Sequence, residues 1–272
     1  MPVSSTPEGR KRWTHMTARS EFLQWLGWFL LVAAFVFCWR IMTQDTIWAF
    51  VHDAPRQGGD ILARALPPRL DYIGQLWIPL WDTINMASLG TLAGTAIAVP
   101  VAFLAARNTT PSILVLRPIA LFVIVASRSI NSLIWALLLV SILGPGMLAG
   151  IIAIALRSVG FIGKLLYEAI EEIDETQVEA VVSTGASRLQ VIDYAIVPQV
   201  LPSFLGTTVF RWDINIRESA ILGLVGAGGL GLKLQSSLNM LAWPQVTAIF
   251  LVILGTVFVS EWISAAVRKA IV

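Results

Sequence analysis

Four arginines lie within or beside long apolar stretches of the sequence, where a charged side chain is costly. They are Arg128, Arg157, Arg211 and Arg217. An arginine at the centre of a bilayer costs ~2.5 to 3.5 kcal/mol on insertion scales unless it faces a partner or water. Asp213 and Glu218 oppose them there, and four positive charges minus two negative charges leave an excess of two per chain. Such an excess suits the passage of an anion.

Helical spacing predicts how these residues face one another. Arg211, Asn215 and Glu218 share one face of a helix, and Asp213 and Arg217 lie four residues apart on roughly the opposite face. For each arginine two interpretations stay open: contact with a passing anion, or an internal salt-bridge network without substrate contact. The candidate pathway residues are Arg128, Ser129, Arg157, Arg211, Asn215 and Arg217.

The composition defines the setting of these residues. Hydrophobic residues make up 56% of the 272 residues and charged residues 13%, with a mean hydropathy of +0.75. These values lie outside the range of soluble globular domains and predict an all-α, polytopic membrane protein. About six helices of ~20 residues each would use roughly half the chain. No separate soluble domain fits beside them.

The apolar pattern predicts six spans, at about 22–42, 79–106, 112–143, 147–167, 198–225 and 243–267. The third is too long for one straight crossing and is interrupted at residues 128–131, and Gly144-Pro145-Gly146 makes a tight turn after it. Residues 43–78 form the longest loop, with turn signals at Gly58-Gly59 and Pro67-Pro68. We therefore divide the chain into residues 1–78, with a tail, one span and a loop, and a transport domain at 79–272.

Basic residues predict the orientation of the spans. Nine lie on the side of the N-terminus and five on the other side. The nine are Arg10, Lys11, Arg12, Arg19, Arg107, Lys164, Arg188, Arg268 and Lys269, and the five are Arg40, Arg56, Arg64, Arg69 and Lys233. The positive-inside rule places both termini in the cytoplasm.

Residues that could serve catalysis, metals or nucleotides are scarce. Cys38 is the only cysteine, and His15 and His52 lie outside the spans, so we expect no catalytic site and no metal site. Gly226, Gly228 and Gly231 spell G-x-G-x-x-G, but they end a span instead of following a strand. The sequence lacks a phosphate-binding loop for ATP, so we expect no cofactor on this chain.

A polar segment at residues 171–198 interrupts the apolar sequence. Valines on one side of a helix follow four acidic residues, Gly185 allows a reversal, and Leu189, Ile192 and Ala195 make a second apolar stripe. Pro198 suits the first turn of the next span. The pattern predicts a helix, a turn and a short amphipathic helix. Such a segment is either a solvated loop or a surface that enters a partner's groove.

The spacing of Glu179-Ala180-Val181, Gly185 and Val197-Pro198 resembles the cytoplasmic E-A-A-x3-G-x9-I-x-L-P loop of ABC-importer permeases. Val181, Ala195 and Val197 depart from that pattern, apolar for apolar. In that family the short helix docks on the ATPase subunit. The coupling residues that the resemblance implies are Glu179, Ala180, Gly185, Ala186, Arg188, Leu189 and Pro198.

Further stretches resemble the phosphonate permeases of that family. They are residues 83–91, 104–108, 128–136, 215–217 and 222–231, and Asn131 stands where proline is expected. The resemblance implies a type I importer fold, a homodimer, two ATPase subunits that use the ATP, and an extracytoplasmic phosphonate-type solute-binding protein. It also implies a bacterial cytoplasmic membrane location, no nucleic-acid partner, and close packing or a gate at Gly226, Gly228, Gly229 and Gly231.

Other functions also fit parts of the sequence. An importer for another small anion or for an amino acid would share the same fold. A secondary transporter or channel would need no ATPase; the coupling-loop spacing disfavours it, and so does the absence of an internal repeat. An intramembrane protease is disfavoured because neither histidine lies in a span.

Overall fold

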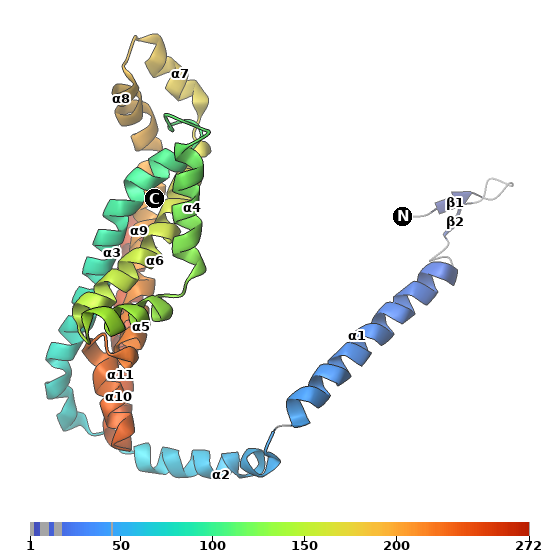
Figure 1. Ribbon diagram of the computed structural model, residues 1–272, viewed down its shortest axis with the longest axis vertical. Coiled ribbons are helices and arrows are strands. Elements are labelled where there is room, and N and C mark those ends of the chain that lie inside the picture. The colour runs from blue at the N-terminus through green and yellow to red at the C-terminus, as the bar shows by residue number, and fades with distance from the viewer. Residues whose placement is uncertain (1–2, 6–10, 14–17, 45, 272) are drawn as a thin grey trace. The chain divides into compact units, whose positions relative to one another are not determined.

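The computed structural model describes residues 3–5, 11–13, 18–44 and 46–271. The chain forms two compact units, Met1–Asp60 and Ile61–Val272. In the first unit, β1 (Val3–Ser5) pairs antiparallel with β2 (Lys11–Trp13), and α1 (Ala18–Gln44) follows. Then comes α2 (Trp48–Ala65) (Figure 1). The described residues are almost entirely helical, which confirms the predicted all-α class.

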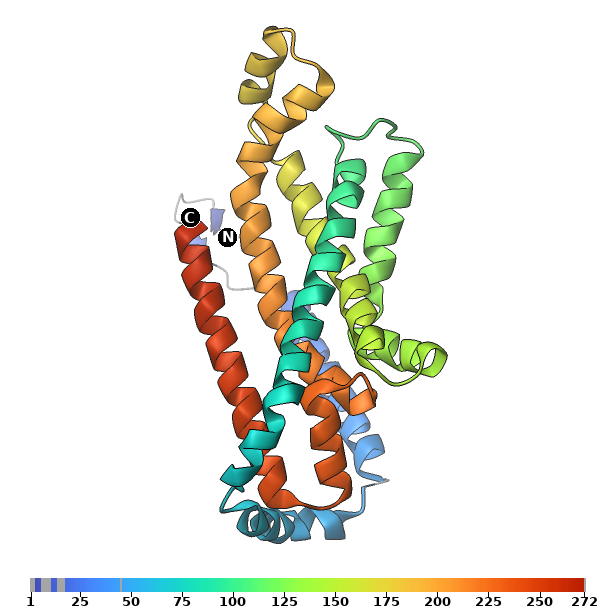
Figure 2. The same cartoon turned by 90° about the vertical axis from the view of Figure 1, so that its left-hand side faces the viewer.

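The second unit contains the remaining elements of the chain. In order they are the 3-10 helix η1 (Leu70–Leu76), α3 (Trp77–Ala105), α4 (Leu116–Ser129), α5 (Ser132–Leu143), α6 (Met147–Glu171), α7 (Glu175–Ser183), α8 (Arg188–Val191), the π-helix η2 (Ile192–Ile196), α9 (Val197–Leu222), the 3-10 helix η3 (Gly223–Val225), α10 (Gly229–Asn239) and α11 (Trp243–Ile271). Figure 2 shows α7 and α8 at one end of this unit, and α10 with the start of α11 at the other.

The helices supply between four and six candidate membrane spans among the described residues, against the six that were predicted. Four stretches are long and apolar enough to cross a membrane alone: Arg19–Gln44, Leu70–Ala105, Met147–Glu171 and Trp243–Ile271. Two bent pairs can supply the others: α4 with α5, which meet at 88°, and Arg188–Val225 with α10, which meet at 43°. Within the described residues, the count therefore reaches six if each bent pair is one span.

The predicted break in the third span is confirmed, and Asn131 explains it. Ile130 is extended (φ −100°, ψ 131°), and the Asn131 side chain accepts a hydrogen bond from the backbone N–H of Leu133 at 3.1 Å. Asparagine is among the preferred N-cap residues because its side-chain oxygen satisfies a free N–H of the first helical turn. Asn131 thus starts α5 without the proline that the family pattern has at this position.

The centre of the second unit is α6, against which α3, α4, α5 and α9 pack. Small residues allow the close approach of α3: a Cβ added at Gly90 would lie 2.6 Å from Cγ2 of Ile154, and one at Gly94 would lie 2.6 Å from Cβ of Ser158. In a membrane, such close backbone contacts replace the hydrophobic driving force that water provides elsewhere.

The expectation of a loop at residues 43–78 is wrong in its centre. Helix α2 runs through both Gly58 and Gly59, which we had assigned to a turn, and η1 follows before α3. Each glycine in a helix costs about 1 kcal/mol relative to alanine. The amphipathic spacing of the large side chains around them favours the helix, and this preference outweighs the cost of the two glycines.

Candidate functional site

A buried polar network joins α9 to α6 and α3. Arg211 is 2% exposed, and its Nε donates to Oγ of Ser158 at 3.2 Å. Nδ2 of Asn215 lies 3.0 Å from the same hydroxyl and 2.7 Å from Oγ1 of Thr91. The Arg211 guanidinium also lies 5.4 Å from the centre of the Phe161 ring. Ser158 therefore holds two of the three polar residues on the predicted face of α9, Arg211 and Asn215.

Glu218 connects this network to a second arginine. Its carboxylate lies 3.4 Å from Nη2 of Arg211 and 3.4 Å from Nε of Arg157 on α6. The Arg157 side chain is 30% exposed and that of Glu218 is 17% exposed. The predicted shared face of Arg211, Asn215 and Glu218 is present, and one carboxylate serves two arginines. Helical spacing could not predict the contact of Arg157 with Glu218, because this contact crosses between α6 and α9.

The other face of α9 carries a separate ion pair. Arg217 pairs with Oδ2 of Asp213, and Oδ1 of Asp213 accepts a hydrogen bond from Ser260 on α11 at 2.6 Å. The Asp213 side chain is 5% exposed, whereas that of Arg217 is 45% exposed. The pair therefore links α9 to α11 and keeps one guanidinium at the surface of the bundle.

Arg128 differs from the other three arginines. It lies at the end of α4, beside the 88° break, and is exposed. In the part of the chain that the structure describes, its guanidinium makes no hydrogen bond or ion pair. The stem of its side chain packs closely against Gly160 on α6, since a Cβ added at Gly160 would lie 2.6 Å from Cγ of Arg128. Ser127 also joins α4 to α6 by accepting a hydrogen bond from the N–H of Gly160 at 2.9 Å. Arg128 is thus a fixed but unpaired cation.

Ser129 and Ser127 play different parts beside Arg128. The Ser129 hydroxyl donates to the Val125 carbonyl at 2.8 Å within α4, and Ser129 is exposed. Ser127 was not among the predicted pathway residues; its hydroxyl donates to the Leu156 carbonyl on α6. Its position next to Arg128 is the signal in the sequence that could have identified it.

The glycine-rich stretch forms the bend between α9 and α10. Gly226, Gly228 and Gly229 have φ of +95°, +96° and +67°, a region that favours glycine. A Cβ at Gly231 would lie 2.7 Å from Cα of Gly223, so two backbones pack directly against each other. The Gly226 carbonyl accepts from the N–H of Gly146 at 3.0 Å. These contacts form a close-packed bend, and a gating role stays a prediction.

Residues 171–198 fold as a helix, a turn and a short helix. Asp174 caps α7 by accepting from the N–H of Thr176 at 2.9 Å, and hydrogen bonds from the Thr176 side chain and backbone lower the pKa of Asp174. Gly185 has φ of +82°. The N–H of Ser187 donates to Gln190 at 2.8 Å, which closes a capping box at the start of α8. The predicted reversal at Gly185 is confirmed.

The predicted apolar stripe after the turn divides in the structure. Leu189 is 79% exposed, whereas Ala195 is 4% exposed, so the two do not form one buried face. Six residues at 100° each place Leu189 and Ala195 about 120° apart around a helix, so helical geometry already separates them, and the π-helix η2 begins between them. Among the other predicted coupling residues, Glu179, Ala180, Gly185, Arg188 and Pro198 are exposed and Ala186 is half-buried.

A groove of about 380 Å³ lies beside the exposed segment. It is lined by Asn108, Thr109, Thr110, Val178, Val182, Ala186, Arg188, Val191, Ile192 and Ile196. Asn108 holds its rim in place by donating to the Ile170 carbonyl at 2.5 Å, near the C-terminal end of α6, where carbonyls lack helical partners. Glu171 accepts from the backbone N–H of Arg107 at 2.9 Å and pairs with Arg117 at 3.3 Å.

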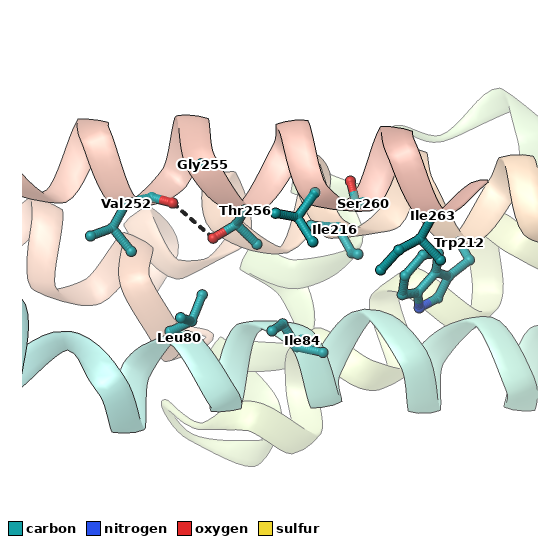
Figure 3. A pocket seen from close by; sticks show the side chains of 10 residues that line it. Leu80, Ile84, Trp212, Ile216, Val252, Gly255, Thr256, Ser260 and Ile263 are labelled. Atoms are coloured by element: carbon teal, nitrogen blue, oxygen red, sulfur yellow. Dashed lines mark hydrogen bonds between the residues drawn. The ribbon is translucent and has the colours of Figure 1, made fainter. Parts of the chain in front are cut away.

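A second cavity of about 380 Å³ lies between α3, α9 and α11 (Figure 3). Its lining is almost entirely apolar, and it includes Leu80, Ile84, Trp212, Ile216 and Val252. The Thr256 hydroxyl, at its edge, is already hydrogen-bonded to the Val252 carbonyl at 2.8 Å (Figure 3). No cationic side chain is among the residues that line this cavity, so it does not suit an anion. Among the described residues, no group of three histidine, cysteine or acidic side chains could hold a metal ion.

The bundle of membrane-spanning helices, its intramembrane arginines and its projecting helix–turn–helix segment together define a transport permease. Residues 98–272 match the family described as binding-protein-dependent transport system inner membrane component, and the chain belongs to that family. The chain is 42% identical to the phosphite transport system permease protein PtxC of Stutzerimonas stutzeri, over 77% of this chain and 76% of that protein.

Two further comparisons concern a relative and a solved structure. The phosphate-import permease protein PhnE of Mycolicibacterium smegmatis is 42% identical over 82% of this chain, which corresponds to 43% of that longer protein. The MetNI methionine ABC transporter in an inward-facing conformation matches with a TM-score of 0.63 and 21% identity, over 74% of this chain and 98% of the solved one. This structural match supports the type I importer fold alone.

Proposed function

We propose that this chain is the permease subunit of an ATP-driven importer for a small phosphorus oxyanion, such as phosphite or a phosphonate. The relatives at 42% identity carry phosphite and phosphate in their names. The observation that carries the proposal is the group of three partly exposed guanidinium groups, Arg128, Arg157 and Arg217, within helices that cross the membrane. Planar guanidinium groups can replace the water around an oxyanion with paired, charge-assisted hydrogen bonds.

The arginines divide into two roles in this proposal. Arg128, without a partner in the described residues, and Arg217, 45% exposed, are the groups that an anion can reach. Arg211 is buried at 2% exposure, so its predicted contact with the passenger requires the network around it to open. Glu218 then acts as an exchangeable counter-ion. Its carboxylate pairs with both Arg157 and Arg211 until an oxyanion takes its place at Arg157.

The proposed assembly contains two copies of this chain, two ATPase subunits and an extracytoplasmic solute-binding protein. A cation that is 45% exposed in the middle of a span must face water or protein, which supports a second copy beside Arg217. The count of nine basic residues against five supports cytoplasmic termini, and Arg117, paired with Glu171, adds a tenth to the first side. This orientation places α7 and α8 in the cytoplasm, where an ATPase subunit can contact Leu189.

Coupling in this proposal follows the covalent chain. The helix that begins at Arg188 continues through η2 into α9, which carries Arg211 and Arg217. At the base of the segment, the N–H of Asp174 donates to Oε1 of Gln199 at 2.9 Å, so the start of α7 is held against the start of α9. Movement of the ATPase subunits would therefore reach the pathway residues through α9.

Uptake measurements test the function. The chain is co-expressed with its ATPase and binding protein, and accumulation of radiolabelled phosphite is measured in cells. Loss of one charged hydrogen bond is worth about 1.5–3 kcal/mol. We therefore expect Arg128→Gln to lower uptake about 10- to 100-fold, while abundance, assembly and basal ATP hydrolysis persist. Arg64→Gln, at an exposed position on α2, is the matched control.

Other results would support other functions. Normal uptake in both Arg128→Gln and Arg217→Gln would remove the anion pathway. Methionine accumulation in place of phosphite would favour an amino-acid importer, the alternative that shares the same fold. Uptake that persists without any ATPase would favour a secondary transporter.

A further inference from the structure

Helix α2 is divided lengthwise into an apolar and a polar face. At 100° per residue, the large apolar side chains occupy one half of the helix and the charged side chains the other. The apolar half carries Trp48, Phe50, Val51, Ile61 and Leu62, and the polar half carries His52, Asp53, Arg56, Gln57, Asp60 and Arg64. No residue of α2 is buried, and the apolar side chains are between 42% and 65% exposed.

Such a helix needs a surface that covers its apolar face. In proteins, packing of an amphipathic face supplies most of the stability of a helix. The apolar face of α2 has no such packing within the described residues. Its occupant must be the bilayer, another part of the assembly, or a second copy of the chain.

Short connections fix α2 at the level where membrane spans end. Only residues 45–47 separate the end of α1 from the start of α2, and three residues reach at most ~10 Å. At its other end, the Ala65 carbonyl accepts from the Thr247 hydroxyl at 3.1 Å. The N–H of Arg69 then donates to the Pro244 carbonyl at 3.1 Å. Thr247 and Pro244 both lie in the first turns of α11, so α2 ends where that span begins.

Aromatic side chains mark the same level. Trp77 and Trp81, in the first turns of α3, are 72% and 61% exposed, and Trp243 begins α11. Exposed tryptophans at span ends are typical of the membrane–water interface. Both ends of α2 therefore belong to this interface, and a helix held there at both ends lies along it.

We infer that α2 lies parallel to the membrane surface, with its apolar face on the lipid acyl chains and its polar face in water. Two aspartates and two arginines balance on the polar face, so the lipid contact does not depend on anionic headgroups. Such a helix would hold the start of α11 at the membrane surface, because the Ala65 carbonyl is hydrogen-bonded to Thr247.

Fluorescence quenching in bilayers tests this inference on the whole chain. Cys38 is replaced by serine, and single cysteines at Val51, Leu62, Asp53 or Asp60 are labelled with a small environment-sensitive dye. The chain is reconstituted in phosphatidylcholine nanodiscs. We expect labels at Val51 and Leu62 to shift to the blue and to be quenched by lipids spin-labelled near the headgroup. We expect labels at Asp53 and Asp60 to be quenched by an aqueous nickel chelate.

Two controls distinguish lipid from protein as the cover of the apolar face, and apolar contact from attraction to charged headgroups. Addition of anionic lipid or of salt should leave the pattern unchanged. Equal quenching of both faces by the aqueous chelate would overturn the inference. A blue shift at Val51 and Leu62 without quenching by spin-labelled lipid would overturn it as well, because protein would then cover the apolar face.

Discussion

Replacing Glu218 with glutamine tests whether one carboxylate holds the arginine network together. The substitution keeps the side-chain length but removes the charge that Arg157 and Arg211 share at 3.4 Å each. Arg211 is 2% exposed, so water cannot replace its counter-charge, whereas Arg157, at 30%, can be partly hydrated. Removing one partner of a buried pair costs ~3–5 kcal/mol, and the partial exposure of Arg157 places the expected loss at about 2–3 kcal/mol.

Asp213→Asn is the matched control on the opposite face of α9. It removes a single charge too, but its partner Arg217 is 45% exposed and can be hydrated. An amide oxygen can still accept from Ser260, which donates to Asp213 at 2.6 Å. We expect a loss of about 1 kcal/mol, at the upper end of the range for pairs with an exposed partner.

The free energies of unfolding can be compared by SDS titration of the purified chain in mixed micelles, with tryptophan fluorescence as the signal. A second series contains phosphite. If an oxyanion takes the place of Glu218, phosphite at ten times its Kd should restore about 1.4 kcal/mol to Glu218→Gln. A variant within about 0.5 kcal/mol of the parent, below the net worth of a charged hydrogen bond, would refute the structural role. A destabilised variant without rescue would refute the exchange.

Three further predictions concern orientation, coupling and packing. In a cysteine-free background, a cysteine at Gln57 should react with an impermeant reagent from outside, and one at Ser187 only after permeabilisation; the reverse pattern would contradict cytoplasmic termini. Leu189→Asp, at a 79% exposed position, should leave the chain inserted but abolish transport-coupled ATP hydrolysis in the purified complex, and intact coupling would argue against this docking surface. Gly231→Ala should lower the yield of folded chain on gel filtration, because a Cβ there would lie 2.7 Å from a neighbouring Cα, whereas Gly206→Ala, with open space around it, should not; equal yields would refute the packing argument.

Patterns within one helix were predictable from the sequence. Arg211 and Glu218 face the same side because helical geometry alone places them there, and Asp213 pairs with Arg217 for the same reason. The left-handed turn at Gly185 followed from glycine's freedom to adopt positive φ. These features depend on local spacing, which the sequence contains directly.

Contacts between helices were not predictable in the same way. Arg157 meets Glu218, and Gly160 admits the stem of Arg128, only because α6 crosses α9 and α4 at particular heights. Helical spacing separates Leu189 from Ala195, but which of the two is buried depends on packing between helices. Helix α2 was not predicted because Gly58 and Gly59 are typical of a turn, although the large side chains around them have amphipathic helical spacing.

The unbroken helix from Arg188 to Val225 has a geometric consequence. At 1.5 Å per residue it is roughly 57 Å long, so each degree of tilt displaces one end relative to the other by about 1 Å. A tilt of a few degrees about one end of the helix therefore moves side chains at the other end by about the width of a water molecule. The glycine bend after Val225 is the natural fulcrum, because the Gly226 carbonyl is hydrogen-bonded to Gly146 and Gly231 packs against Gly223, whereas Leu189, near the other end, is 79% exposed.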